Sequence, residues 1–171
     1  MENKVAELLI QEARYRLIEE SIPRLHKCLD QLTEEEIWFR PNSNTVSIGN
    51  LVLHLCGNVK QWLISGLGGV PDKRERQKEF DEPGPLPTEE LRERLDSLAT
   101  DIESVLKQLT TDDLLSLKSI QGNDSSGVSI LVHVVEHFSY HVGQVTIMVK
   151  SRKDIDMGYY AGQDLEKRND P

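Results

Sequence analysis

Residues Leu131 to Lys150, LVHVVEHFSYHVGQVTIMVK, constrain the fold of this chain more than any other segment. A helix here would be apolar nearly all round, which is typical of a central helix or of one covered by a second subunit. Histidines occur in it at positions 133, 137 and 141. With about 3.6 residues per turn, His137 and His141 lie about 40° apart around the helix, close enough for both rings to bind one metal ion.

A second apolar stretch, SIGNLVLHLCGNVKQWLISGL from Ser47 to Leu67, carries the histidine best placed to be a third ligand. Its polar residues form one stripe on a helix: Asn50, His54, Asn58 and Gln61. The downstream helix has a matching stripe that ends at Gln144. Because a buried polar group without a partner costs about 1 to 3 kcal/mol, we expect the two stripes to face each other. The sequence therefore predicts a metal site between two helices.

Spacing alone leaves the choice of ligands open, because His133 and His137 have the same relation as His137 and His141. The segment from His133 to His137 also matches the H-x-x-E-H pattern of a class of zinc proteases, but a five-residue match is weak. Glu136 is a further candidate, as an additional ligand or as an outer carboxylate. A lone histidine in a core is usually bonded to neighbouring hydroxyls or carbonyls. Several aligned histidines favour a metal instead.

Helical periodicity extends over most of the remaining chain. Apolar residues recur three or four apart from Glu2 to about Leu32, which predicts an amphipathic helix that Pro23 should kink. Another helix begins at Thr88 and has an inward stripe of Leu91, Leu95, Leu98, Ile102, Val105, Leu106 and Leu109. The last helix begins at about Ser126. Four long helices indicate an all-α bundle.

The connections are predicted to be irregular. Residues 33–39 have the sequence of a capped helical turn. The stretch 70–87 is rich in proline, glycine and charge and predicts a long surface loop, and strand-like alternation is absent. We expect one bundle domain over residues 1–152, followed by a tail over residues 153–171 that becomes loose toward its end.

The composition indicates a soluble protein. A length of 171 residues fits one domain, and the formal net charge of −9 disfavours binding to nucleic acid or anionic lipid. No apolar run approaches the roughly 20 residues that span a bilayer, and the N-terminal stretch lacks the pattern of a signal peptide. We therefore expect a cytoplasmic protein with a small-molecule substrate. Cys28 and Cys56 are too few for a disulfide scaffold and are predicted to be buried free thiols.

Three basic residues, Lys73, Arg74 and Arg76, lie in the predicted loop after the His54 helix. Such a run is usually a solvated surface. In an acidic chain it is also a place where the carboxylates of a small anionic cofactor or substrate would bind. Arg74 and Arg76 are the predicted residues for that role.

The segments LVLHLCGN around His54 and HVVEHFSYHVGQ downstream resemble the DinB-like superfamily of metal-binding four-helix bundles. The resemblance extends over about residues 5–150, and its most specific element is H-x-x-x-H-x-x-Q, formed here by His137, His141 and Gln144. It implies an up-down-down-up bundle, often a homodimer, with His54, His137 and His141 as metal ligands. The stretch 47–80 looks like an uncharacterised bacterial branch of the superfamily.

Characterised members of that superfamily include transferases that use low-molecular-weight thiols such as bacillithiol. The resemblance implies a similar S-transferase chemistry on small electrophiles, in which a metal ion lowers the pKa of the thiol. Zinc or nickel is the expected ion, with iron or manganese next, and Gln144 would orient a ligand or the substrate. The alternative is a non-catalytic bundle whose ion stabilises packing and which has a structural or stress-related binding role.

Overall fold

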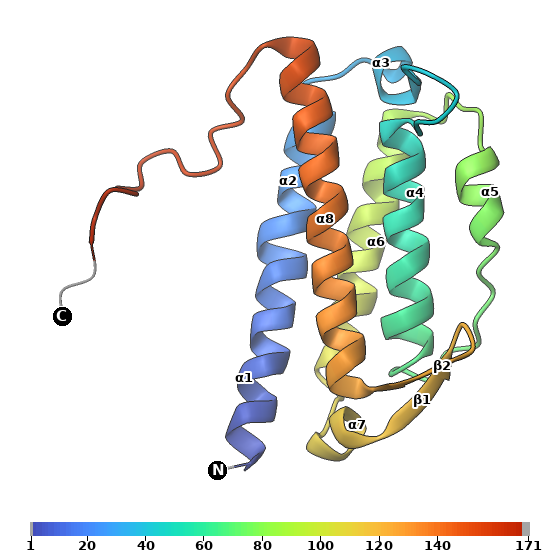
Figure 1. Cartoon of the computed structure of the whole chain (residues 1–171), viewed down its shortest axis with the longest axis vertical. Helices are drawn as coiled ribbons and strands as arrows, with labels where there is room; N and C mark the ends of the chain where they lie inside the picture. Colours follow the sequence, from blue (N-terminus) through green and yellow to red (C-terminus); the bar gives the residue numbers. More distant parts are fainter. Residues whose placement is uncertain (1, 169–171) are drawn as a thin grey trace.

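Four long helical segments packed side by side make up most of the computed structural model, which describes residues 2–168 (Figure 1). The first segment consists of α1 (Glu2–Arg14), the π-helical η1 (Tyr15–Ser21) and α2 (Ile22–Leu29). The second consists of α4 (Ile48–Val59) and the π-helical η2 (Lys60–Ser65). The third is α6 (Thr88–Leu106) and the fourth is α8 (Gly127–Lys153). The prediction of an all-α bundle is confirmed.

Contacts at one end of the bundle define the direction of the helices. The short helix α3 (Glu34–Trp38) contacts the first residue of α6, since the Thr88 N–H donates to Glu34 Oε1 at 3.1 Å. It also contacts the last residue of α8, because Lys153 Nζ lies 2.7 Å from Glu36 Oε2. α1 begins at the opposite end (Figure 1). The order is therefore up-down-down-up, as the resemblance implied.

The core lies between the four segments and is mainly aliphatic. The predicted inward stripe of α6 is buried apart from Leu109, which follows the helix and is partly buried. α8 buries one side, including Val134 and Phe138, but Val132 is 53% exposed and Ile147 is 58% exposed. One face of α8 is therefore not covered within the described chain.

Pro23 is accommodated near the beginning of α2, directly after the wider turns of η1. Proline has no N–H to donate to a carbonyl in the preceding turn, and a π-helical turn is one way for a helix to continue past such a gap. The first segment therefore runs on through Pro23 (Figure 1).

Two of the predicted connections contain regular structure. The stretch 70–87 includes a short helix, α5 (Arg76–Asp81), so the expectation of an unstructured loop was wrong. The expectation that strands are absent was also wrong, because β1 (Leu117–Ile120) and β2 (Asn123–Ser126) form an antiparallel hairpin after α7 (Thr111–Leu115). Gln121 and Gly122 both have positive φ, as a tight two-residue hairpin turn requires. Mostly polar strand residues concealed this hairpin in the sequence.

The tail after α8 starts against the bundle. Met157 is buried, and the guanidinium of Arg24 lies 4.8 Å from the ring centroid of Tyr159. The boundary between a bundle domain and a tail after residue 152 stays a prediction. Residue 1 of the predicted domain and residues 169–171 of the predicted tail lie outside the described residues. Within the described chain, no helix has both the length and the apolar character needed to cross a membrane.

Candidate metal centre

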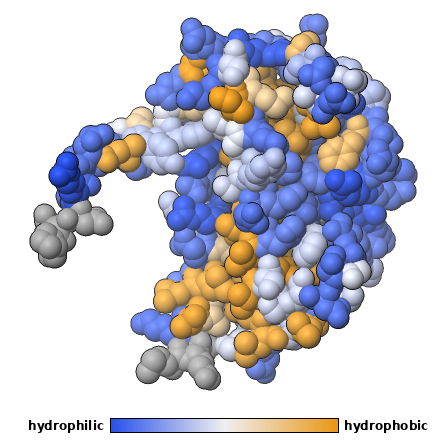
Figure 2. Space-filling model, viewed as in Figure 1, coloured by the Kyte–Doolittle hydropathy of each residue, from blue (hydrophilic) through white to orange (hydrophobic). Residues whose placement is uncertain are grey.

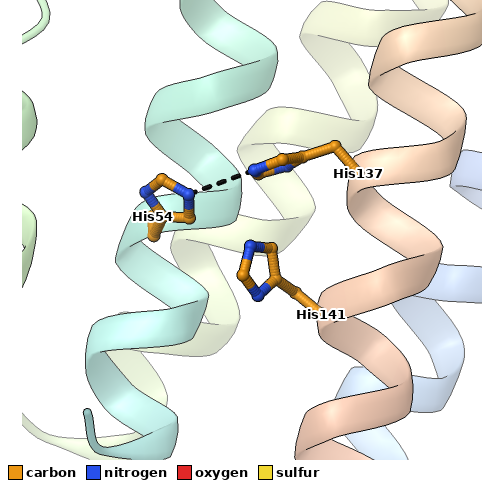
Figure 3. Close-up of side chains that lie close together, drawn as sticks. All are labelled: His54, His137 and His141. Carbon is orange, nitrogen blue, oxygen red and sulfur yellow. Dashed lines mark hydrogen bonds between the residues drawn. The ribbon is translucent and has the colours of Figure 1, made fainter. Parts of the chain in front are cut away.

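His54 projects from α4 toward α8, which carries His137 and His141 (Figure 3). α4 begins at a capping box in which Ser47 and Asn50 exchange hydrogen bonds between side chain and backbone, and this cap fixes the start of the helix. His54 is buried, and the two histidines of α8 are partly buried. The three predicted ligands thus come together from two elements that are far apart in the sequence.

The three imidazoles converge on one point. One ring nitrogen of each histidine lies within 4.8 Å of the nitrogens of the other two. The Nε2 atoms of His54 and His137 are 3.1 Å apart (Figure 3). Two nitrogens bound to one tetrahedral zinc ion at about 2.0 to 2.1 Å would be about 3.3 Å apart. The observed separation is therefore close to the one that a shared metal requires.

Two of the rings are held by hydrogen bonds at their other nitrogen. Nδ1 of His141 lies 2.7 Å from Gln144 Oε1, and Nδ1 of His54 lies 2.9 Å from Glu79 Oε2. The amide oxygen of Gln144 accepts, so the ring of His141 donates its Nδ1–H and keeps an unprotonated Nε2. Nδ1 of His54 also lies 3.1 Å from Nη2 of Arg74, which can only donate, and it is the contact with Glu79 that favours the same tautomer for His54. That is the tautomer of a metal ligand. Nδ1 of His137 is buried and has no hydrogen-bond partner among the described residues.

Glu79 is the residue that the sequence did not indicate. It lies in α5, and its carboxylate forms a two-point ion pair with Arg74, with Nε–Oε1 at 2.7 Å and Nη2–Oε2 at 2.9 Å. Burial alone would raise the pKa of Glu79, but the hydrogen bonds from Arg74 and His54 outweigh it and lower that pKa. The carboxylate is therefore ionised. In the sequence it is one acid in the charged run RERQKEFDE.

The histidines of α8 are neutral at physiological pH. Burial lowers the pKa of His137 to about 3, and the neighbouring His141 and His54 add to this shift. Burial also lowers the pKa of His141. Neutral imidazoles have the free lone pairs that a metal ion needs.

His133 and Glu136 do not join this cluster. The ring of His133 packs on Trp62 with centroids 4.0 Å apart, and its Nε2 lies 3.4 Å from Asn58 Nδ2. Glu136 is exposed. Among the described residues, the group with ligand atoms this close together consists of three histidines alone. The arrangement therefore favours the ligand pair on α8 that includes His141, and gives no support to the protease pattern.

The two arginines predicted to bind carboxylates lie in different surroundings. The side chain of Arg74 is only 4% exposed, so it is not part of a solvated basic surface. Besides Glu79 it contacts Gln61, since Nη1 donates to Gln61 Oε1 at 2.9 Å. Arg76 is exposed and its guanidinium lies 4.8 Å from the ring centroid of Phe80. Binding of an anionic cofactor by these two residues stays a prediction.

Known proteins resemble this chain in sequence and in fold. Residues 4–159 match the model of a family described as "Protein of unknown function (DUF1572)". The structure is similar to the crystal structure of a DinB-like protein from Bacillus cereus ATCC 10987, with a TM-score of 0.66 and 20% sequence identity over 85% of this chain and 91% of that chain. No curated protein matches the chain in sequence.

Proposed function

The chain belongs to the DinB-like superfamily, through the family described as protein of unknown function DUF1572, and we propose that it is a metal-dependent enzyme with His54, His137 and His141 as ligands. The observation that carries the proposal is the convergence of three imidazoles, two of which have their Nδ1 atoms in contact with an acceptor oxygen, of Gln144 for His141 and of Glu79 for His54.

The residues fit a divalent ion of the first transition row. Imidazole nitrogen suits zinc and nickel, which we place before iron and manganese. Three protein ligands leave a coordination position for a substrate, whereas structural zinc sites usually have four protein ligands and often use cysteine. Neither cysteine belongs to the cluster, because the group of close ligand atoms among the described residues contains only histidine. An open, catalytic type of site is therefore the better fit.

The reaction that we propose is transfer of a small thiol, of the bacillithiol type, to a small electrophile. When bound, a divalent ion lowers the pKa of a coordinated thiol. The chain would supply the fixed imidazoles and the charge around them, with Gln144 orienting His141. Its own thiols are unsuited to the attack, because burial raises the pKa of Cys56 to about 12 and also raises the pKa of Cys28. The nucleophile would therefore be a separate molecule.

A non-catalytic metal-binding bundle is the second candidate. A cavity of about 530 Å³ borders α4 and the 70–87 segment, and it is lined by Gly57, Arg74 and Glu79 but by none of the three histidines. A buried ion that no substrate reaches would act on stability alone.

Turnover separates the two candidates. Zinc- or nickel-loaded protein would be incubated with bacillithiol and a fluorogenic electrophile, beside His137→Ala. An enzyme loses thiol transfer in the variant and keeps its helical circular-dichroism spectrum. A structural site shows no transfer in either protein, and His137→Ala lowers the unfolding temperature of the metal-loaded form.

We also propose that the protein is a cytoplasmic homodimer. α8 exposes Val132, Tyr140 and Ile147 by 53%, 63% and 58%, and α1 exposes Val5 and Leu8 by 68% and 54%. Figure 2 shows apolar side chains gathered over the end of the molecule where α1 and α8 begin. A second copy would cover such apolar surface.

A further inference from the structure

We infer that Glu79 is a positioning residue of the metal centre: it fixes the ring of His54, and Arg74 and Gly57 hold its carboxylate in place. This inference rests on the proposed metal binding. The 70–87 segment crosses the outer side of α4 (Figure 1), and none of its residues belongs to the three-histidine group. Its role under this inference is to hold Glu79 against His54.

The contact of Glu79 with His54 has the form of a carboxylate that orients a metal-binding histidine. Oε2 lies 2.9 Å from Nδ1, on the side of the ring away from His137, and Nη2 of Arg74 lies 3.1 Å from the same nitrogen. The carboxylate is the acceptor of the two. A carboxylate at this position selects the Nδ1–H tautomer, stops rotation of the ring and makes Nε2 more basic. All three effects favour a metal at Nε2.

Arg74 holds this carboxylate in its position beside His54. Its two contacts with Glu79 engage both carboxylate oxygens, so the carboxylate cannot turn away from His54 without breaking a buried pair. The exposed fractions of the two side chains are 4% and 11%. Breaking a buried pair of this kind is costly, since one charge is left without a partner.

Backbone contacts hold the segment that carries Glu79. The side-chain amide of Asn50 donates to the carbonyl oxygens of Glu79 and Glu82, at 3.0 and 2.9 Å. Arg40 donates to the carbonyl oxygen of Phe80 at 2.7 Å. Asn50 lies one helical turn before His54 on α4. The helix that carries His54 therefore also holds the backbone of the segment that carries Glu79.

Gly57 provides the space for the carboxylate. A Cβ atom at this position would lie 1.9 Å from Glu79 Oε1 and 3.1 Å from Arg74 Nε. A side chain of any size therefore displaces the carboxylate from its present position. Glycine is unfavourable in the middle of a helix by about 1 kcal/mol relative to alanine, so its presence in α4 needs a local reason such as this one.

The test measures zinc affinity by competition with a chromogenic chelator in wild type, Glu79→Gln, Glu79→Ala and Gly57→Ala. Loss of an outer hydrogen-bond partner of a metal ligand typically weakens metal binding about 10- to 100-fold. We expect zinc to bind about 10-fold more weakly to Glu79→Gln and more weakly still to Glu79→Ala. Gly57→Ala keeps both Glu79 and Arg74, and we expect it to lose about as much zinc affinity as Glu79→Gln. Glu75→Gln is the matched control, because Glu75 is exposed in the same segment and pairs with Lys78.

Two further readouts separate positioning from a purely structural role. The visible spectrum of the cobalt-substituted protein reports the ligand geometry, and the unfolding temperature of the metal-free protein reports the fold. Positioning predicts an altered cobalt spectrum in Glu79→Gln with a small change in metal-free unfolding. An unchanged spectrum, with zinc affinity within twofold of wild type in all variants, overturns the inference. If wild type itself binds no zinc, the proposed metal site has failed instead.

Discussion

The Nε2 atoms of His54 and His137 lie 3.1 Å apart, although 83 residues separate them in the sequence. Two imidazole nitrogens at this distance share one proton or one metal ion, and the third ring, of His141, is close enough to complete a metal site. The strongest prediction therefore concerns metal content.

Wild-type protein purified without chelator and loaded with zinc or nickel should hold about one ion per chain, a stoichiometry set by the single three-histidine group among the described residues. His54→Ala and His137→Ala should each lose it, because two imidazoles bind a metal far more weakly than three. Elemental mass spectrometry provides the measurement. His133→Ala is the control, since this ring packs on Trp62 outside the group and its removal should leave the metal in place.

Zinc should raise the unfolding temperature of the wild-type protein. A ligand present at about 100 times its dissociation constant stabilises the native state by about 2.7 kcal/mol, which for a domain of this size corresponds to roughly 5 to 10 °C. Calorimetry with and without zinc checks this shift. The same shift in His137→Ala would place the stabilising ion elsewhere on the molecule.

Both cysteine thiols should be unreactive in the native protein. Burial raises the pKa of Cys56 to about 12, so only about one thiol in ten thousand is ionised at pH 8. Burial also raises the pKa of Cys28. A chromogenic disulfide reagent should detect almost no thiol at pH 8 and two per chain in denaturant. Rapid native reaction of two thiols would mean that the helices around them open readily.

The buried thiol of Cys56 makes the free energy of unfolding depend on pH in the alkaline range. Cys56 has a raised pKa in the folded chain, so its contribution to stability is complete below the ordinary thiol pKa of 9.0 and is lost as the pH rises toward about 12. The free energy of unfolding of wild type, measured with denaturant, should therefore fall between those pH values. Cys56→Ala should show a smaller decline over the same range, and an equal decline would assign the effect to other groups.

Gly84→Ala should destabilise the protein, because two costs act together. The residue has φ of 63°, which costs an alanine roughly 1 to 2 kcal/mol, and the added Cβ would lie 2.1 Å from Trp38 Cδ2. Gly69→Ala is the matched control, with φ of 72° and no atom within 4 Å of its Cβ. The free energy of unfolding, measured with denaturant, should fall further in Gly84→Ala than in Gly69→Ala, by about 1 kcal/mol or more. Equal losses would mean that Trp38 moves aside without cost.

The proposed homodimer can be tested at the exposed face of α8. Ile147→Lys places a charge where the side chain is 58% exposed and should shift the mass measured by light scattering from dimer to monomer. Leu165→Lys is the control, since Leu165 is 65% exposed and belongs to the tail, which extends away from α8 (Figure 1). A monomeric wild type would exclude the homodimer.

The helical part of the fold was predictable because it depends on local spacing. Apolar residues three or four apart define α6, and the polar stripe through His54 faces the one through His137, as the cost of burying unpaired polar groups predicted. The hairpin of β1 and β2 was missed, because its stability comes from the turn at Gln121 and Gly122 and not from an apolar alternation.

The helices, the histidine spacing on α8 and the acidic charge could all be read from the amino-acid order, since each is a property of neighbouring residues or of composition. Tertiary packing was needed to establish that His133 lies outside the cluster, that Arg74 is buried and that Glu79 contacts His54. Those three outcomes depend on how separate segments meet. A charged residue in a loop has no local pattern that reveals which buried partner it contacts.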